Sequence, residues 1–160
     1  MRLEETLGPV LMARQLTLAV AESCTGGLIG HRLTNVPGSS DYFLGGITAY
    51  SYSAKEKLLG VRPETLQTFG AVSEPTVREM ARGACRALGA HLGLAVTGIA
   101  GPGGATPDKP VGLTWIALCA PGFERAERYV WTGDRVANKE ASAEAALRLV
   151  LDYLEQTSPR

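Results

Sequence analysis

The chain has 160 residues, of which 45% are hydrophobic and 20% charged, a composition typical of a globular domain with its own core. Its 16 basic and 16 acidic side chains give a formal net charge of zero, so neither a nucleic-acid-binding face nor a polybasic membrane surface is expected. Three widely spaced cysteines (Cys24, Cys85 and Cys119) suggest neither a disulfide framework nor a zinc site.

The first part of the chain alternates between helical and strand-like patterns. Apolar residues at helical spacing predict a helix over residues 3–13, and the apolar run 16–21 predicts a buried strand. A second helix is expected over 27–33, where Pro37-Gly38 follows as a stop signal. A second strand is expected over 43–50.

Three helices are expected in the middle of the chain. Two short ones cover residues 54–59 and 63–69. The third begins at Ser73-Glu74-Pro75, where the serine can cap the helix and the first turn tolerates proline, and it ends at Gly89.

Strands return in the C-terminal part. They are expected over residues 92–96, 111–119 and 126–131, the last two forming an antiparallel hairpin, and a final helix covers about 135–154. Strands alternating with helices predict an α/β fold. We expect a three-layer α/β/α sandwich around a mixed, largely parallel sheet, in a single domain over residues 1–160.

The turn after the first strand is the strongest candidate for a site, because ligands of α/β sheets bind where strands end. Ser23 lies in this turn, and the N–H groups of Thr25, Gly26 and Gly27 could hold a phosphate or an oxyanion. The alternative is that Ser23 or Thr25 only caps the following helix.

A nucleophilic serine needs a base. His31 lies two turns down the following helix, roughly 10 Å from its start, and His91 precedes the third strand at the opposite sheet edge. Lys55 follows the second strand at the same edge as Ser23, and a lysine there can act as a base if burial lowers its pKa. The alternative is that Lys55 is a solvated lysine on a short helix.

Two further segments point to this edge of the sheet. The loop 97–104 carries four glycines and a proline, which indicates close approach to a ligand or a flexible connection. Arg135 lies at the start of the last helix, where the helix dipole disfavours a positive charge. Its position therefore suggests that it binds an anion such as phosphate, and the alternative is an ordinary surface arginine. These segments together predict a site for a small polar or phosphorylated molecule.

Several blocks carry a resemblance to a known family. Ala21-Glu22-Ser23-Cys24-Thr25-Gly26-Gly27 is similar to the signature of the CinA C-terminal domain family. Six more blocks follow in the family's order, across about residues 15 to 150: Pro37-Gly38-Ser39-Ser40, Gly45-Gly46, Tyr50-Ser51-x-x-x-Lys55, Gly70-Ala71-Val72-Ser73-Glu74-Pro75, Thr97-Gly98-Ile99-Ala100-Gly101-Pro102 with Lys109-Pro110-Val111-Gly112, and Gly133-Asp134-Arg135.

The resemblance implies an amidohydrolase that converts nicotinamide mononucleotide to nicotinic acid mononucleotide and ammonia, a step of pyridine-nucleotide salvage. It implies Ser23 as nucleophile, Lys55 as base and Tyr50 near the reacting group, with no metal and no cofactor. We expect a cytoplasmic homodimer that binds a small nucleotide and neither nucleic acid nor membrane. The substrate-binding residues expected at this stage are Thr25, Gly26, Gly27, Gly46, Thr97, Gly98, Gly101 and Arg135.

The chain departs from the family pattern in two ways. Tyr52 stands where the family often has asparagine, and the molybdopterin-binding-like domain of many relatives is absent, so we expect the stand-alone form. Two other functions stay open. One is a non-catalytic nucleotide-binding module that regulates competence or the response to DNA damage. The other is a pyrophosphatase-like enzyme, which the lack of an acidic cluster disfavours.

Overall fold

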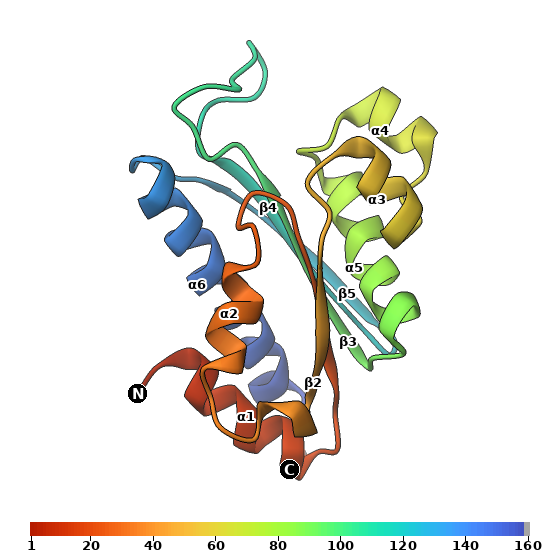
Figure 1. The fold of residues 1–160 in the computed structure, drawn as a ribbon, viewed down its shortest axis with the longest axis vertical. Coiled ribbons are helices and arrows are strands. Elements are labelled where there is room, and N and C mark those ends of the chain that lie inside the picture. Colours follow the sequence, from red (N-terminus) through yellow and green to blue (C-terminus); the bar gives the residue numbers. More distant parts are fainter. Residues whose placement is uncertain (159–160) are drawn as a thin grey trace.

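The computed structural model describes residues 1–158, which form a five-stranded sheet between two layers of helices (Figure 1). The strands are β1 (Leu18–Glu22), β2 (Phe43–Thr48), β3 (Leu92–Gly98), β4 (Leu113–Ala120) and β5 (Phe123–Val130). The helices are α1 (Leu3–Ala13), α2 (Leu28–Thr34), α3 (Tyr52–Leu59), α4 (Pro63–Phe69), α5 (Glu74–Leu88) and α6 (Arg135–Gln156), with a 3-10 turn, η1 (Ser39–Asp41).

The sheet is mixed, with the strand order β2-β1-β3-β4-β5. Strands β2, β1 and β3 are parallel to one another, whereas β4 and β5 are antiparallel to their neighbours. The α/β class and the mixed sheet predicted from the sequence are therefore confirmed. Because the three parallel strands run in the same direction, their carboxyl ends meet at one edge of the sheet.

Helices cover both faces of the sheet (Figure 1). Helices α1, α2 and α6 cover one face, where Leu18 and Val20 of β1 enter the larger apolar core. Helices α3, α4 and α5 cover the other, where Ala19 and Ala21 of the same strand enter a second core. The alternation follows from the period of two along a strand, and it produces the predicted three-layer sandwich.

The α5 face of the sheet is built from small residues. A Cβ added to Gly93 of β3 would lie only 2.2 Å from the carbonyl oxygen of Ala81 in α5. This clearance shows that the helix backbone lies directly on the sheet, which only a glycine permits. The close packing holds the middle of α5 against the amino-terminal part of β3.

Some boundaries differ from the predicted ones. The second hairpin strand begins at Phe123 rather than at residue 126, so Pro121-Gly122 alone make the turn. The ring of Phe123 lies 4.7 Å from that of Tyr153 in α6, a contact between distant residues that no local pattern reveals. Within residues 1–158, no helix is both long and apolar enough to cross a membrane.

Candidate active site

Ser23 follows β1 directly and is held between the two neighbouring strands. Its N–H donates to the carbonyl oxygen of Val96 in β3 at 3.0 Å, and the preceding carbonyl, of Glu22, accepts from the N–H of Ala49 after β2 at 2.9 Å. The serine therefore continues the hydrogen bonding of the sheet. Its position depends on three strands rather than on a mobile loop.

Lys55 lies beside Ser23. Its Nζ is 2.9 Å from Ser23 Oγ and donates to the carbonyl oxygen of Ala49 at 2.8 Å. The lysine belongs to the first turn of α3, which begins because the Ser51 hydroxyl accepts from the N–H of Ala54. The structure thus brings together the nucleophile and base proposed from the sequence, although 32 positions separate them.

The side chain of Lys55 is buried, with 1% of its surface exposed. Burial lowers its pKa from 10.5 to about 8, because the loss of water destabilises the charged ammonium more than the neutral amine. No ion pair among residues 1–158 involves Lys55. An amine in this state is available near neutral pH to accept the proton of a serine hydroxyl.

Cys24, next to Ser23, also lines the site, but its chemistry is different. Burial raises the pKa of its thiol to about 12, so the side chain remains a neutral thiol. A protonated thiol is a poor nucleophile. Of the two neighbouring residues, Ser23 is therefore the one with an activating partner.

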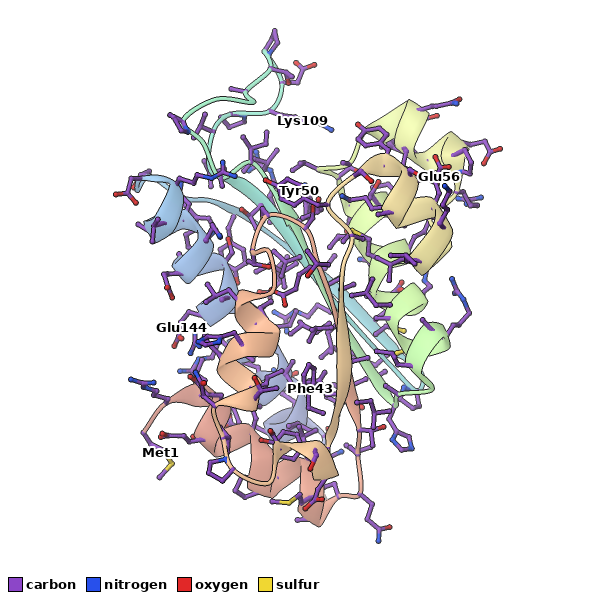
Figure 2. All side chains as sticks on the ribbon, in the orientation of Figure 1. Met1, Phe43, Tyr50, Glu56, Lys109 and Glu144 are labelled. Carbon is purple, nitrogen blue, oxygen red and sulfur yellow. The ribbon has the colours of Figure 1, made fainter. Side chains whose placement is uncertain are left out.

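A cavity of about 250 Å³ opens above this pair. Seven of the predicted site residues line it: Ser23, Tyr50, Lys55, Thr97, Gly98, Gly101 and Arg135. Figure 2 places Tyr50 and Lys109 at the same end of the molecule, with Phe43, the first residue of β2, farther down the sheet. The cavity therefore lies at the carboxyl ends of the parallel strands, as the sequence predicted.

Arg135 spans the mouth of this cavity. It donates to the carbonyl oxygen of Gly101 at 2.8 Å and to the hydroxyl of Tyr50 at 3.0 Å. No carboxylate within residues 1–158 forms an ion pair with it. The guanidinium therefore keeps an uncompensated positive charge beside the cavity.

Thr25, Gly26, Gly27 and Gly46 do not line this cavity. The hydroxyl of Thr25 is buried and donates to Glu22 at 2.6 Å, and the N–H of Gly26 is used by the carbonyl of Ser23. Gly27 caps α2 in a left-handed conformation. Gly46 lies within β2, where an added Cβ would be 2.9 Å from Val20.

The N-terminus of α2, which we expected to hold an anion, is occupied by a carboxylate of the chain itself. Glu22 is buried and accepts from the N–H groups of Ile29 and Gly30 at 2.9 and 3.1 Å. A side chain from the preceding strand thus satisfies the free donors of this helix. No local pattern indicates this role, because capping side chains normally come from the residue next to the helix, whereas Glu22 belongs to β1.

Other residues of the site were also missed. Ala71 and Val72 form one wall of the cavity, and the carbonyl of Ala71 accepts from Thr97 at 2.8 Å. Tyr52, the departure from the family pattern, accepts from the N–H of Ala71 at 3.2 Å. Asn138 of α6 donates to the carbonyl of Ala100 in the glycine-rich loop at 3.0 Å. Its only signal in the sequence was a polar residue early in the last helix.

The two histidines lie away from the Ser23 pair. His91 contacts Thr17 before β1, at the amino ends of the strands, and His31 lies within α2 near Asn35. Neither histidine is therefore placed to act as the base for Ser23. Within residues 1–158, His, Cys, Asp and Glu side chains form no group of three that could hold a metal ion.

Several solved structures share this fold. A competence-damaged protein (CinA) superfamily protein from Klebsiella pneumoniae is 33% identical, with a TM-score of 0.93 and 96% of each chain covered. The competence/damage inducible protein CihA from Agrobacterium tumefaciens is 38% identical, with a TM-score of 0.88 and 97% of each chain covered.

Proteins with similar sequences carry the same kind of name as these structures. A competence-damage inducible protein of Moorella thermoacetica is 52% identical over 148 residues, which are 92% of this chain and 36% of that protein. A CinA-like protein of Chlorobaculum tepidum is 52% identical over 159 residues, 96% of this chain and 38% of that protein. The chain thus spans less than half the length of these relatives. The family model described as the CinA C-terminal domain matches residues 1–154. The chain therefore belongs to the CinA C-terminal domain family.

Proposed function

We propose that this chain hydrolyses the carboxamide of nicotinamide mononucleotide, giving nicotinic acid mononucleotide and ammonia. The observation that carries the proposal is the contact of 2.9 Å between Ser23 Oγ and the Nζ of the buried Lys55. A serine activated by a neutral amine is suited to acyl transfer from an amide. The family resemblance supplies the substrate.

The acylation step uses Lys55 first as a base and then as an acid. The neutral amine takes the proton of Ser23 as Oγ attacks the carboxamide carbon, and a tetrahedral intermediate forms. Lys55 then gives this proton to the departing nitrogen, and the C–N bond breaks. Ammonia leaves, and the nicotinoyl group remains as an ester on Ser23.

The deacylation step repeats the sequence with water. Lys55 takes a proton from the water that attacks the ester carbon, and it returns a proton to Ser23 Oγ as the C–O bond breaks. The product leaves as a carboxylic acid, which loses its proton to solvent and becomes the carboxylate, and the dyad is restored. All proton transfers involve one lysine, which agrees with a pKa of about 8, close to the working pH.

The rest of the cavity suits the remainder of the substrate. We propose that Thr97, Gly98 and Gly101 contact the ring and ribose, while Arg135 faces the phosphate. An arginine without a carboxylate partner suits phosphate, since the planar guanidinium can donate two parallel hydrogen bonds. Tyr50 lines the same cavity, and its hydroxyl accepts a hydrogen bond from Arg135.

An ammonia-release assay on nicotinamide mononucleotide tests this function. We expect turnover by the wild-type chain, unchanged by a chelator. We expect Ser23→Ala to lower kcat by about a thousandfold or more, as for the loss of other serine nucleophiles. The matched control is Ser53→Ala, which removes an exposed hydroxyl on α3. Near-normal turnover by Ser23→Ala contradicts the mechanism, and binding without ammonia release by the wild type contradicts the function.

We further propose that residues 1–160 act as one domain, in the cytoplasm, as a homodimer whose only other partner is the small nucleotide. Sedimentation of the purified chain at several concentrations tests the dimer. A molecular mass that stays at the monomer value of 16.9 kDa contradicts it.

A further inference from the structure

Asn138 connects α6 to the glycine-rich loop of the cavity. The residue is 3% exposed, and its side-chain amide bonds on both sides. Its Nδ2 donates to the carbonyl oxygen of Ala100 at 3.0 Å, and its Oδ1 accepts from the N–H of Gly133 at 3.0 Å. Because Gly133 can only donate through its N–H, the oxygen of the amide must face it, and the nitrogen must face Ala100.

The bond to Ala100 also orients the next N–H group. In a trans peptide the C=O and the N–H point in opposite directions, so the N–H of Gly101 points away from Asn138. Within the part of the chain that the structure describes, this N–H has no hydrogen-bond acceptor. Gly101 lines the cavity, so an unused donor is available there.

The neighbouring peptide is held in a similar way. The guanidinium of Arg135 donates to the carbonyl of Gly101, one residue along the loop from the carbonyl that Asn138 holds. The one acidic residue next to it in sequence, Asp134, has its carboxylate bonded to the N–H of Ala137 at 2.8 Å. Two side chains from the first two turns of α6 thus hold the peptides on both sides of Gly101. The cation of Arg135 therefore lies beside the unused N–H of Gly101.

We propose that Asn138 is a positioning residue, which aims the N–H of Gly101 at the phosphate of the substrate beside Arg135. The inference rests on the proposed function, because it takes nicotinamide mononucleotide as the ligand. It extends that function by naming a backbone donor for the phosphate and the buried side chain that holds it in place. Asn138 does not itself touch the substrate.

The test compares two ligands that differ only in the phosphate. Binding of nicotinamide mononucleotide and of nicotinamide riboside is measured by calorimetry in a Ser23→Ala background, where no turnover occurs. Asn138→Asp keeps an acceptor for Gly133 but removes the donor to Ala100. We expect it to weaken mononucleotide binding by about tenfold, as for the loss of one good hydrogen bond, with riboside binding unchanged.

Ser142→Ala is the matched control. Ser142 is buried on the same helix and bonds Trp131 and the backbone of Asn138, without contacting the loop. We expect it to alter the melting temperature but to leave the affinity ratio of the two ligands as it was. An Asn138→Asp variant that keeps this ratio, or that weakens both ligands equally, overturns the positioning role.

A second measurement needs no change at Asn138, and so remains informative if that variant does not fold. The amide proton resonance of Gly101 is followed in Ser23→Ala during titration with each ligand. We expect a shift with the mononucleotide and none with the riboside. The absence of a shift, or the same shift with both, overturns the inference. Failure of the wild type to release ammonia from the mononucleotide overturns the proposed function instead.

Discussion

Arg135, the first residue of α6, donates a hydrogen bond of 3.0 Å to the hydroxyl of Tyr50, two residues after the end of β2. The contact crosses the cavity mouth and joins segments 85 positions apart in the chain. Tyr50 is 61% exposed, so it contributes little to the core. Its hydroxyl is therefore placed to hold Arg135 in the orientation in which the guanidinium faces the cavity.

Tyr50→Phe removes this hydrogen bond and keeps the ring. We expect the KM for nicotinamide mononucleotide to rise about tenfold or more, since a hydrogen bond to a charged group contributes about 1.5 kcal/mol or more, with kcat nearly unchanged. Steady-state ammonia release measures both constants, and Tyr129→Phe on β5 is the distant control. A hundredfold loss of kcat at unchanged KM would instead place the Tyr50 hydroxyl in the chemical step.

The activity is expected to depend on pH through Lys55. Burial lowers the pKa of this amine to about 8, and only the neutral form can accept the proton of Ser23. We therefore expect kcat/KM to rise about tenfold per pH unit below 8 and to become constant above it. A pH–rate profile of the wild type checks this, and a flat profile between about pH 6 and pH 9 would show that Lys55 is not the base.

Lys55 is also expected to reduce the stability of the fold. Its pKa is about 8 in the folded protein and 10.5 for a solvated lysine, the value taken for the unfolded chain. Between these two pH values the unfolded chain therefore binds more protons than the folded one. The free energy of unfolding therefore rises with pH over this window, and the penalty is present in full below pH 8. We expect Lys55→Met to raise the free energy of unfolding at neutral pH by about 1–2 kcal/mol while abolishing turnover.

Denaturant unfolding at neutral and at alkaline pH measures this effect. Lys57→Met, which changes an exposed lysine on the same helix, is the control for the loss of a positive charge. We expect the advantage of Lys55→Met over Lys57→Met to shrink as the pH approaches 10.5. A Lys55→Met variant that is less stable than Lys57→Met at neutral pH is incompatible with a desolvated ammonium at this position.

Glu22 is expected to matter for both stability and turnover, because its carboxylate binds α2 to the turn that carries Ser23. Glu22→Gln keeps the shape but replaces one acceptor oxygen by a donor nitrogen, which cannot serve Ile29 or Gly30. We expect a loss of about 1–2 kcal/mol in the free energy of unfolding, similar to the loss of a helix cap, together with a lower kcat. Glu140→Gln, an exposed residue on α6, is the control, and an unchanged melting temperature for Glu22→Gln would rule out this capping role.

Gly101→Ala tests the glycine-rich loop directly. Gly101 has φ of +85°, and an added Cβ would lie 2.5 Å from Val111 Cγ1, so the loop must shift. We expect kcat/KM to fall at least about tenfold, because the N–H of Gly101 and the carbonyl held by Arg135 move together. Gly122→Ala, in the turn between β4 and β5, has φ of +67° with open space around it. Gly122→Ala therefore introduces similar backbone strain without displacing the site. Similar kinetics for the two variants would show that the position of the glycine-rich loop does not matter for turnover.

The chemistry at the sheet edge could be predicted because it depends on topology. Once Ser23 and Lys55 are assigned to the segments after two parallel strands, both must lie at the same edge, and the structure confirms this. Thr25, Gly26 and Gly27 were expected at the cavity but do not line it. Adjacency to Ser23 in the sequence does not place them there, and the N-terminus of the helix that follows them is occupied by Glu22.

The second wall of the cavity had no comparable signal. Ala71 and Val72 precede α5 as ordinary small residues, and Ala71 is held by hydrogen bonds to Thr97 of β3 and Tyr52 of α3. Asn138 is one polar residue on a long helix, and only its contacts with Ala100 and Gly133 reveal its role. Contacts of this kind are set by packing distances, which periodicity does not contain.

The sequence by itself determined the order of helices and strands, the α/β class and the edge of the sheet where the site lies, because apolar periodicity and turn residues act over a few positions. Only the tertiary structure decided that Lys55 is desolvated and bonded to Ser23, that Glu22 occupies the N-terminus of α2 and that α6 holds the glycine-rich loop. These features depend on burial and on hydrogen bonds between residues far apart in the chain, and both exist only after the layers have packed.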